Sequence, residues 1–244
     1  MSAPATPLSL NEIKFFFTRA AVGAGAPFGF GESFSKSLIF LAALGLDPAR
    51  IAAPALDALA TGASVPVAAF DAGPEGLTAR ATIQGAPISA LYAGPAVADR
   101  LLLLAARGDA LPVLLPAVDQ PALVLAAIGA SKIALPRIAV SWHDGADAVR
   151  VVLSGDGVDV SGAPAAGLVR RTPAFTTVCV ADTDGLPPFS AEAFLKAQSG
   201  RLAEGVAVDG ESFAAVQRHF RKCLVPSTDR SRIAGAGAGL TDND

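Results

Sequence analysis

The sequence is poor in the side chains that most often build catalytic and metal centres. Its 244 residues include two cysteines, two histidines, one tryptophan, one tyrosine and one methionine. The two cysteines, Cys179 and Cys223, are too few for the disulfide framework of a small secreted domain, and both lie in apolar runs. We therefore expect buried free thiols and a reducing compartment.

Catalytic motifs are also missing. There is no Gly-x-Ser-x-Gly, no phosphate-binding loop and no His-Glu-x-x-His, which excludes the hydrolases and nucleotide-binding enzymes that need these motifs. No His, Cys and Asp spacing resembles a zinc site. His219 and Cys223 stand four residues apart and share a helix face, so they could bind a metal or act as base and nucleophile, but no further ligand accompanies them. The sequence identifies no metal site and leaves the cofactor open.

Long hydrophobic runs and a strong charge of one sign are absent too. The longest apolar runs, 37–46 and 122–128, are far below the ~20 residues that cross a bilayer. Residues 1–8 do not resemble a signal peptide. The net charge of −3 gives no general attraction to nucleic acid or to acidic membranes. We expect a cytoplasmic protein that binds neither nucleic acid nor membrane.

Apolar residues are abundant: they make up 52% of the chain, and the mean hydropathy is +0.48. Much of this is alanine, which is consistent with a compositional bias of the source. Burial of an apolar surface in a homo-oligomer would explain it equally well.

The first 60 residues predict helices joined by short turns. Ser9 and Glu12 form a capping box at the start of the first helix. A second helix is expected over about 29–44. Asp47 then has the position of an N-cap with a proline after it, and Pro54 is expected to break the helix that follows.

The middle of the chain predicts mostly strands, and Asp-Gly pairs favour tight hairpin turns between two pairs of them. Strands are expected over 65–70, 77–83, 88–92, 138–142, 149–153, 158–160 and 175–180, and helices over 95–107 and 122–128, the latter capped by Asp119. The last four strands are typical of an antiparallel meander. The sequence therefore predicts an α+β fold rather than a parallel α/β fold.

We expect one α+β domain over residues 1–244, a helical N-terminal module packed on a mostly antiparallel sheet with C-terminal helices. Residues 1–60 form the helical module, residues 61–185 the strand-rich middle, and residues 186–244 a helical C-terminal part. In that last part, Ser190 caps a helix that ends before Gly200, and Asp209 caps another. A glycine-rich tail closes the chain.

The tail is the first candidate site. Gly235, Gly237 and Gly239 alternate, so an extended tail presents one bare face that a ligand or another backbone can approach closely. Thr241 and Asp242 follow as polar groups. Three interpretations stay open: a flexible tail with a solvated acidic end, a ligand-binding segment, and a strap across a subunit interface.

The second candidate is the glycine-rich loop between the first two helices. Gly23 and Gly25 lie in this loop, and free amides at the start of the next helix could bind a carboxylate or phosphate. The loop is not a dinucleotide fingerprint, because Phe28 occupies the third glycine position and no strand precedes it. Glu32, near the start of the second helix, is either a general base or a residue that stabilises the helix dipole.

We hypothesise that loop and tail converge on one site for a small anionic metabolite. Arg19, Arg230 and Arg232 would bind its carboxylate, and Glu32 or Asp242 would move a proton.

Both ends of the chain resemble an uncharacterised bacterial family, the domain of unknown function 3726. The resemblance rests on four segments: Ser9–Ile13, Arg19–Gly25, Gly45–Asp47 and Ser231–Asp244. In the family a Gly-x-x-Glu-Glu run follows the glycine loop, whereas here Glu32 is followed by Ser33, so the second acid is missing. The resemblance implies a bacterial cytoplasmic protein from a small-molecule catabolic setting and brings no established activity.

The sequence thus favours a small-molecule catabolic enzyme, with lyase, hydrolase and isomerase chemistry all open. The alternative is a non-catalytic subunit that holds a partner enzyme with its glycine-rich tail.

Overall fold

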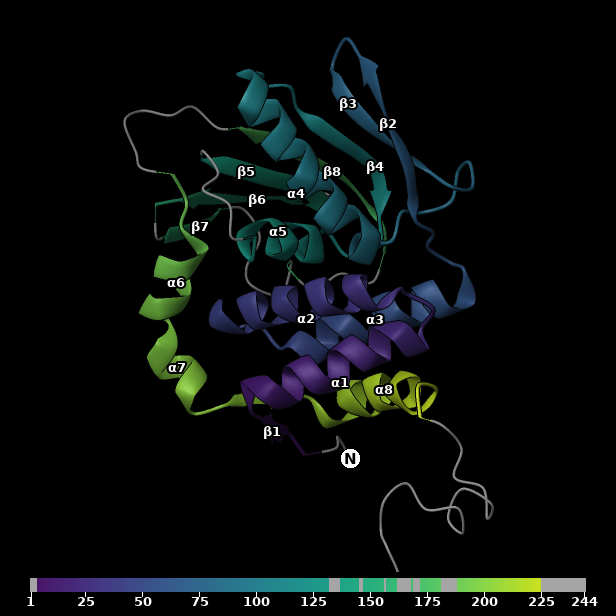
Figure 1. Cartoon of the computed structure of the whole chain (residues 1–244), viewed down its shortest axis with the longest axis vertical. Helices are drawn as coiled ribbons and strands as arrows, with labels where there is room; N and C mark the ends of the chain where they lie inside the picture. Colours follow the sequence, from purple (N-terminus) through teal and green to yellow (C-terminus); the bar gives the residue numbers. More distant parts are fainter. Residues whose placement is uncertain are drawn as a thin grey trace, which may run out of the picture.

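The computed structural model describes residues 4–131, 137–144, 147–155, 157–161, 168, 172–180 and 188–224. Helices form the lower part of the molecule in Figure 1, and a seven-stranded sheet with two covering helices forms the upper part. This arrangement confirms the predicted α+β class.

The lower part is a layer of four helices, α1 (Leu10–Gly23), α2 (Phe28–Ala43), α3 (Pro48–Thr61) and α8 (Gly210–Arg221). A short antiparallel ribbon of β1 (Thr6–Leu8) and β9 (Val206–Val208) lies beside them. The N-terminal helices therefore pack against the last described helix (Figure 1).

The sheet has the strand order β2-β3-β4-β8-β5-β6-β7. Its strands are β2 (Val67–Gly73), β3 (Gly76–Ala81), β4 (Val113–Val118), β5 (Ile138–Asp144), β6 (Asp147–Ser154), β7 (Gly157–Ser161) and β8 (Ala174–Val180). Only the β3–β4 pair is parallel, and the other described pairs are antiparallel. The predicted meander is correct for β5, β6 and β7, but its fourth strand, β8, pairs with β4 and β5 and does not continue it after β7.

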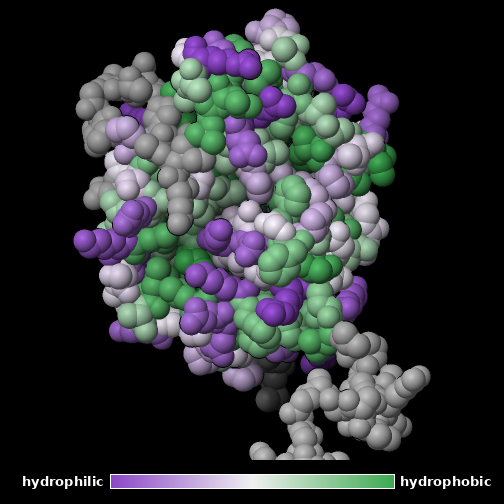
Figure 2. Space-filling model, viewed as in Figure 1, coloured by the Kyte–Doolittle hydropathy of each residue, from purple (hydrophilic) through white to green (hydrophobic). Residues whose placement is uncertain are grey.

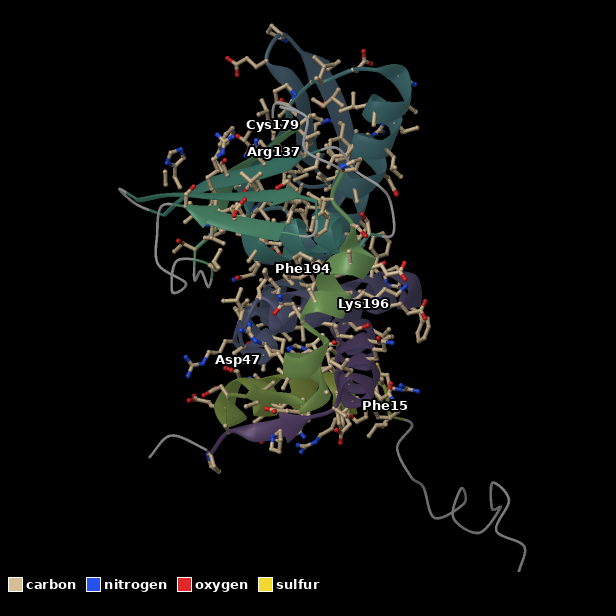
Figure 3. All side chains as sticks on the ribbon, turned by 90° about the vertical axis from the view of Figure 1, so that its left-hand side faces the viewer. Phe15, Asp47, Arg137, Cys179, Phe194 and Lys196 are labelled. Atoms are coloured by element: carbon tan, nitrogen blue, oxygen red, sulfur yellow. The ribbon has the colours of Figure 1, made fainter. Side chains whose placement is uncertain are left out.

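Two pairs of helices connect the parts. α4 (Ala90–Arg107) and α5 (Pro121–Gly129) lie against the sheet on the side shown in Figure 1. α6 (Ala191–Ala197) and α7 (Ser199–Ala203) descend along one edge from the sheet to the helical layer. At the junction, Phe194 of α6 (labelled in Figure 3) packs against Phe40 of α2, with the two ring centroids 5.0 Å apart.

Local capping chemistry starts the helices as predicted. The Ser9 and Glu12 capping box is present at α1. Asp47 accepts hydrogen bonds from amides of the first turn of α3, and Asp209 does the same at α8. Each cap satisfies backbone donors that have no partner inside the helix.

The helices α3 and α8 run parallel and in register. At their starts, the Asp209 amide donates to Oδ2 of Asp47 over 2.7 Å. Ten residues further along both helices, Nε2 of His219 lies 2.7 Å from Oδ1 of Asp57. Both contacts join residues at the same separation in the sequence, so together they fix how far α8 is displaced along the axis of α3.

Three expectations about helix boundaries are wrong. α3 continues through Pro54, because Ile51 and Leu56 on its buried face hold the helix against its neighbours. α4 begins at Ala90, well before Pro95, so residues 88–92 are not a strand. The helix expected between Ser190 and Gly200 is divided into α6 and α7, with Gly200 inside α7.

Glycine and alanine allow the helices to approach closely. A Cβ on Gly31 of α2 would lie 2.6 Å from the Thr18 carbonyl oxygen on α1, and one on Gly94 of α4 would lie 2.5 Å from Cβ of Ala127 on α5. Much of the alanine noted in the sequence is therefore core. None of the helices in the described ranges is long and apolar enough to cross a membrane.

Candidate functional site

The glycine-rich loop between α1 and α2 exposes bare backbone. α1 ends at Gly23, and α2 begins at Phe28 with Pro27 as its N-cap. Gly25 has a φ of +104°, and a Cβ on Gly25 or Gly29 would meet nothing within 4 Å. No side chain of the described residues caps α2, and the Phe30 and Gly31 amides donate to the Pro27 carbonyl, which leaves the amides of Phe28 and Gly29 for a ligand.

The glycines of this loop differ in their surroundings. A Cβ on Gly23 would collide with the backbone carbonyl of His219 on α8, so this glycine permits close packing of two helices. Gly25 and Gly29, in contrast, are exposed. A ligand can thus approach the backbone closely at Gly25 and Gly29.

Arg19 precedes the loop on α1, with its guanidinium over Phe15 one turn back toward the start of the helix, and Glu32 follows the loop on α2. The Arg19 guanidinium lies 4.0 Å from the ring centroid of Phe15, and the Arg19 carbonyl accepts a hydrogen bond from the Cys223 thiol over 2.8 Å. Glu32 is exposed on α2 just beyond its first turn, and its two interpretations, a general base and a dipole-stabilising residue, stay predictions. The cation–π contact leaves the guanidinium N–H groups of Arg19 available to an anion.

The remaining predicted site residues lie outside the described part of the chain. They are Arg230, Arg232, Gly235, Gly237, Gly239, Thr241 and Asp242. Convergence of the loop and the tail therefore stays a prediction.

A buried polar junction that the sequence does not predict as a site lies near the loop. Three separate segments meet through parallel bridges from Ile88 to Val65 and to Val118. Four polar side chains next to these residues are almost completely buried: Ser64, Ser89, Asp119 and Gln120. α4 and α5 both start here, directly after Ile88 and Val118, so two helix N-termini point at one group of polar side chains.

Asp119 is the ionisable member of this junction. Its Oδ1 accepts a 2.8 Å hydrogen bond from the Ala90 amide, so it caps α4 rather than α5, whose N-cap is Gln120. Burial raises the pKa of Asp119 to about 6, although the Ala90 amide and the Ser64 hydroxyl act in the opposite direction. Its Oδ2 has no hydrogen-bond partner of standard geometry among the described residues.

The junction and the glycine loop lie at the same end of the helical layer. Phe30, in the first turn of α2, packs against Tyr92 in the first turn of α4, with ring centroids 4.6 Å apart. Figure 1 shows the α1–α2 loop and the start of α4 on the same side of the molecule. A sequence signal for Asp119 exists, because it directly follows an apolar run and precedes a proline that starts a helix. That local pattern indicates a cap for α5, whereas Asp119 caps α4.

The cysteines and His219 are engaged in the fold. Cys179 lies on β8 in the sheet (Figure 3) and Cys223 just after α8, and both are free thiols, as expected, although only partly buried. His219 is buried and contacts Asp57, and burial raises the pKa of the Cys223 thiol, which opposes its use as a nucleophile. Within the described residues, no group of three or more His, Cys, Asp or Glu could hold a metal ion.

Comparison with known proteins places these features in context. Residues 8–71 match the model of a family described as a protein of unknown function, DUF3726. This match confirms the resemblance predicted from the N-terminal motifs, and the Ser231–Asp244 motif lies outside it. No curated protein matches the chain.

Two solved structures share the fold. Malate dehydrogenase from Entamoeba histolytica aligns with a TM-score of 0.57 and 7% identity, covering 91% of this chain and 99% of that chain. Malate dehydrogenase from Pyrococcus horikoshii OT3 aligns with a TM-score of 0.53 and 8% identity, covering 92% and 97%. At such identities the likeness shows the fold alone. The chain thus resembles the uncharacterised family DUF3726 over its first helices and has the fold of these two dehydrogenases over nine-tenths of its length.

Proposed function

We propose that this protein is an enzyme that binds a small anionic metabolite at the start of α2. The observation that carries the proposal is the exposed, uncapped first turn of a 16-residue helix, preceded by Gly25 and containing Gly29. Free amides and the positive end of the helix dipole favour a carboxylate or phosphate at this point.

The other residues have proposed roles around this anion. Arg19, Arg230 and Arg232 bind its carboxylate, and Gly23, Gly25, Gly235, Gly237, Gly239 and Thr241 line the site. Glu32 or Asp242 moves a proton, in a lyase, hydrolase or isomerase reaction. The tail residues follow α8, which packs on α1, and this proximity supports their use in the same site.

The fold match supports the same substrate class by analogy. Both similar structures are malate dehydrogenases, and malate is a small anionic metabolite. Because one fold hosts many activities, the match sets the order of the ligands to test and does not define the reaction. Malate and related hydroxy acids therefore come first in the ligand panel.

Thermal stability with and without the tail tests the proposal. A panel of small organic acids, amino acids and divalent metals is added to the full chain and to a chain truncated before Leu240. Ligand binding raises the apparent melting temperature by mass action, so an organic acid should stabilise the full chain only. Equal stabilisation of the truncated chain would overturn the proposed role of the tail.

A variant tests the helix start separately. Gly29→Asp places a carboxylate in the first turn of α2, where it stabilises the helix and competes with an anionic ligand. We expect an unchanged or higher melting temperature without ligand and at least about tenfold weaker binding of the acid. Lys14→Gln on α1 is the control, and unchanged acid binding by Gly29→Asp would contradict the site.

The second candidate function is a non-catalytic subunit that holds a partner enzyme with its tail. It is favoured by the exposure of large apolar side chains near the end of α8, where Phe15 is 44% and Leu224 51% exposed. It predicts that the native protein purifies in a complex or homo-oligomer that truncation before Leu240 dissolves, with no ligand-induced stabilisation. Light scattering on the full and truncated chains measures this.

A further inference from the structure

A groove separate from the α1–α2 loop lies between α2, α4 and α5. It encloses about 330 Å³ and is lined by Ser33, Lys36, Ser37, Pro95, Ala98, Asp99, Ala127, Ala130 and Ser131. The three helices lie on the side of the molecule shown in Figure 2, where hydrophilic side chains stand between the upper and lower parts. This volume is at the lower end of the range for small-molecule sites.

Hydrogen-bond acceptors dominate the polar part of the groove. The Ser33, Ser37 and Ser131 hydroxyls donate to the carbonyls of Gly29, Ser33 and Ile128 respectively. With their hydrogens used in this way, the serine oxygens can only accept from a ligand. Asp99 adds an exposed carboxylate from α4.

The end of α5 favours a positive group at the same place. α5 finishes at Gly129 with Ala130 as its C-cap, and its last turn contains no basic residue. Within the described residues, therefore, no cation of the helix itself opposes the negative end of its dipole. An ammonium group has three hydrogen-bond donors and can bind hydroxyl, carbonyl and carboxylate acceptors together.

Lys36 is the cation among the described residues that line the groove. Lys36 on α2 lines the groove and is exposed, yet no ion pair joins it to Asp99 in the described chain. Two opposite charges are thus held on different helices, on either side of a small cavity. The small apolar side chains of Ala98, Ala127 and Ala130 also line the groove.

We propose that this groove binds a free α-amino acid with a small side chain as its zwitterion. Its ammonium group is held by Asp99, the serine oxygens and the end of α5, and its carboxylate by Lys36. The alanines leave room for the amino-acid side chain. The groove begins at Ser33, about one helical turn from the anion site at the start of α2, and reaches Lys36, about two turns from it, and its proposed ligand does not depend on the anion site.

Calorimetric titration of the full chain with L-alanine, L-serine and glycine tests the proposal. L-alanine methyl ester and N-acetyl-L-alanine are titrated as well, because each lacks one charge of the zwitterion. At least one free amino acid should bind, and each alanine derivative should bind about tenfold or more weakly than alanine, since a hydrogen bond to a charged group is removed. Absence of binding by every amino acid at about 10 mM overturns the proposal, because such a zwitterion site should reach millimolar affinity.

Two variants assign the binding to the groove. Asp99→Asn should weaken alanine binding about tenfold and abolish the preference for alanine over its N-acetyl derivative. Lys36→Gln should weaken alanine binding about tenfold and abolish the preference for alanine over its methyl ester. Asp109→Asn and Lys14→Gln remove exposed charges elsewhere and serve as controls.

Gly29→Asp separates the two sites. In one outcome, Gly29→Asp weakens amino-acid binding while Asp99→Asn and Lys36→Gln leave it unchanged. That result would place the ligand at the start of α2 and overturn the groove as its site. Amino-acid binding that only the groove variants weaken supports the proposal, whatever the fate of the anion site.

Discussion

Asp119 is the side chain that burial perturbs most among the described residues with a resolved pKa. It is 6% exposed, and no charged neighbour compensates the removal of its carboxylate from water. Its folded-state pKa of about 6 lies above the value of 3.8 for an exposed carboxyl. The folded protein therefore binds this proton more tightly than the unfolded chain does.

This shift makes a prediction about stability and pH. Because the folded-state pKa is raised, the stabilising contribution of the protonated group is complete below about pH 4 and disappears as the pH rises through about 6. Asp119→Asn keeps the acceptor for the Ala90 amide and does not titrate. Relative to the native chain, its free energy of unfolding should rise by about 2 kcal/mol between about pH 4.5 and pH 7.

Urea unfolding of both chains across this pH range measures the difference. Asp109→Asn, at an exposed position after α4, is the matched control and should follow the native curve. A constant difference between Asp119→Asn and the native chain at all pH values would show that the carboxyl titrates alike in the folded and unfolded states.

At the residue scale, the sequence identifies candidate groups better than it identifies their surroundings. Glu32 and Arg19 are recognisable because charges beside a glycine loop are visible in one segment. The helix that Asp119 caps is not recognisable, because this carboxyl meets the Ala90 amide and Ser64, from two other segments, only in the folded chain. When three separate segments together bury a side chain, no local pattern in the sequence indicates that burial.

At the scale of elements, Gly23 controls the packing of α1 against α8. A Cβ at this position would collide with backbone, which cannot rotate away as a side chain can. Gly23→Ala should therefore separate the helices and lower the free energy of unfolding by about 1–3 kcal/mol. Chemical denaturation measures the decrease.

Gly29→Ala is the matched control for this substitution. Its Cβ would meet nothing within 4 Å, so it should leave stability unchanged or raise it by up to about 1 kcal/mol through helix propensity. Equal effects of the two substitutions would mean that α1 and α8 do not pack through Gly23.

Elements are predictable where local chemistry defines them. The predicted helix starts after Ser9, Asp47 and Asp209 are correct because each cap bonds to its own first turn. The course of α3 through Pro54 is not predictable, because packing against other helices compensates for a missing backbone hydrogen bond. β4 is not predicted because its short apolar run contains Pro116, which argues against a central strand.

At the scale of the whole molecule, one core connects the helical layer with the sheet. The same cluster of buried side chains includes Ile13 of α1, Leu125 of α5, Val140 of β5 and Val216 of α8. α2 packs against α5, and Phe40 of α2 packs against Phe194 and Phe189 from the C-terminal part. Because this cluster extends through both parts, we expect unfolding as a single cooperative unit, and the one-domain organisation expected from the sequence stays a prediction.

The single tryptophan allows this organisation to be tested. Trp142 lies fully buried on β5, so its fluorescence reports on the sheet, whereas the far-ultraviolet circular dichroism is dominated by the helices. Both signals should give the same denaturation midpoint in the native chain. Gly23→Ala, which acts at the far side of the helical layer, should lower both midpoints equally, because weaker packing in one part of a cooperative unit destabilises the whole. If the substitution shifts the circular dichroism midpoint and leaves that of Trp142 in place, the helical layer and the sheet are separate domains.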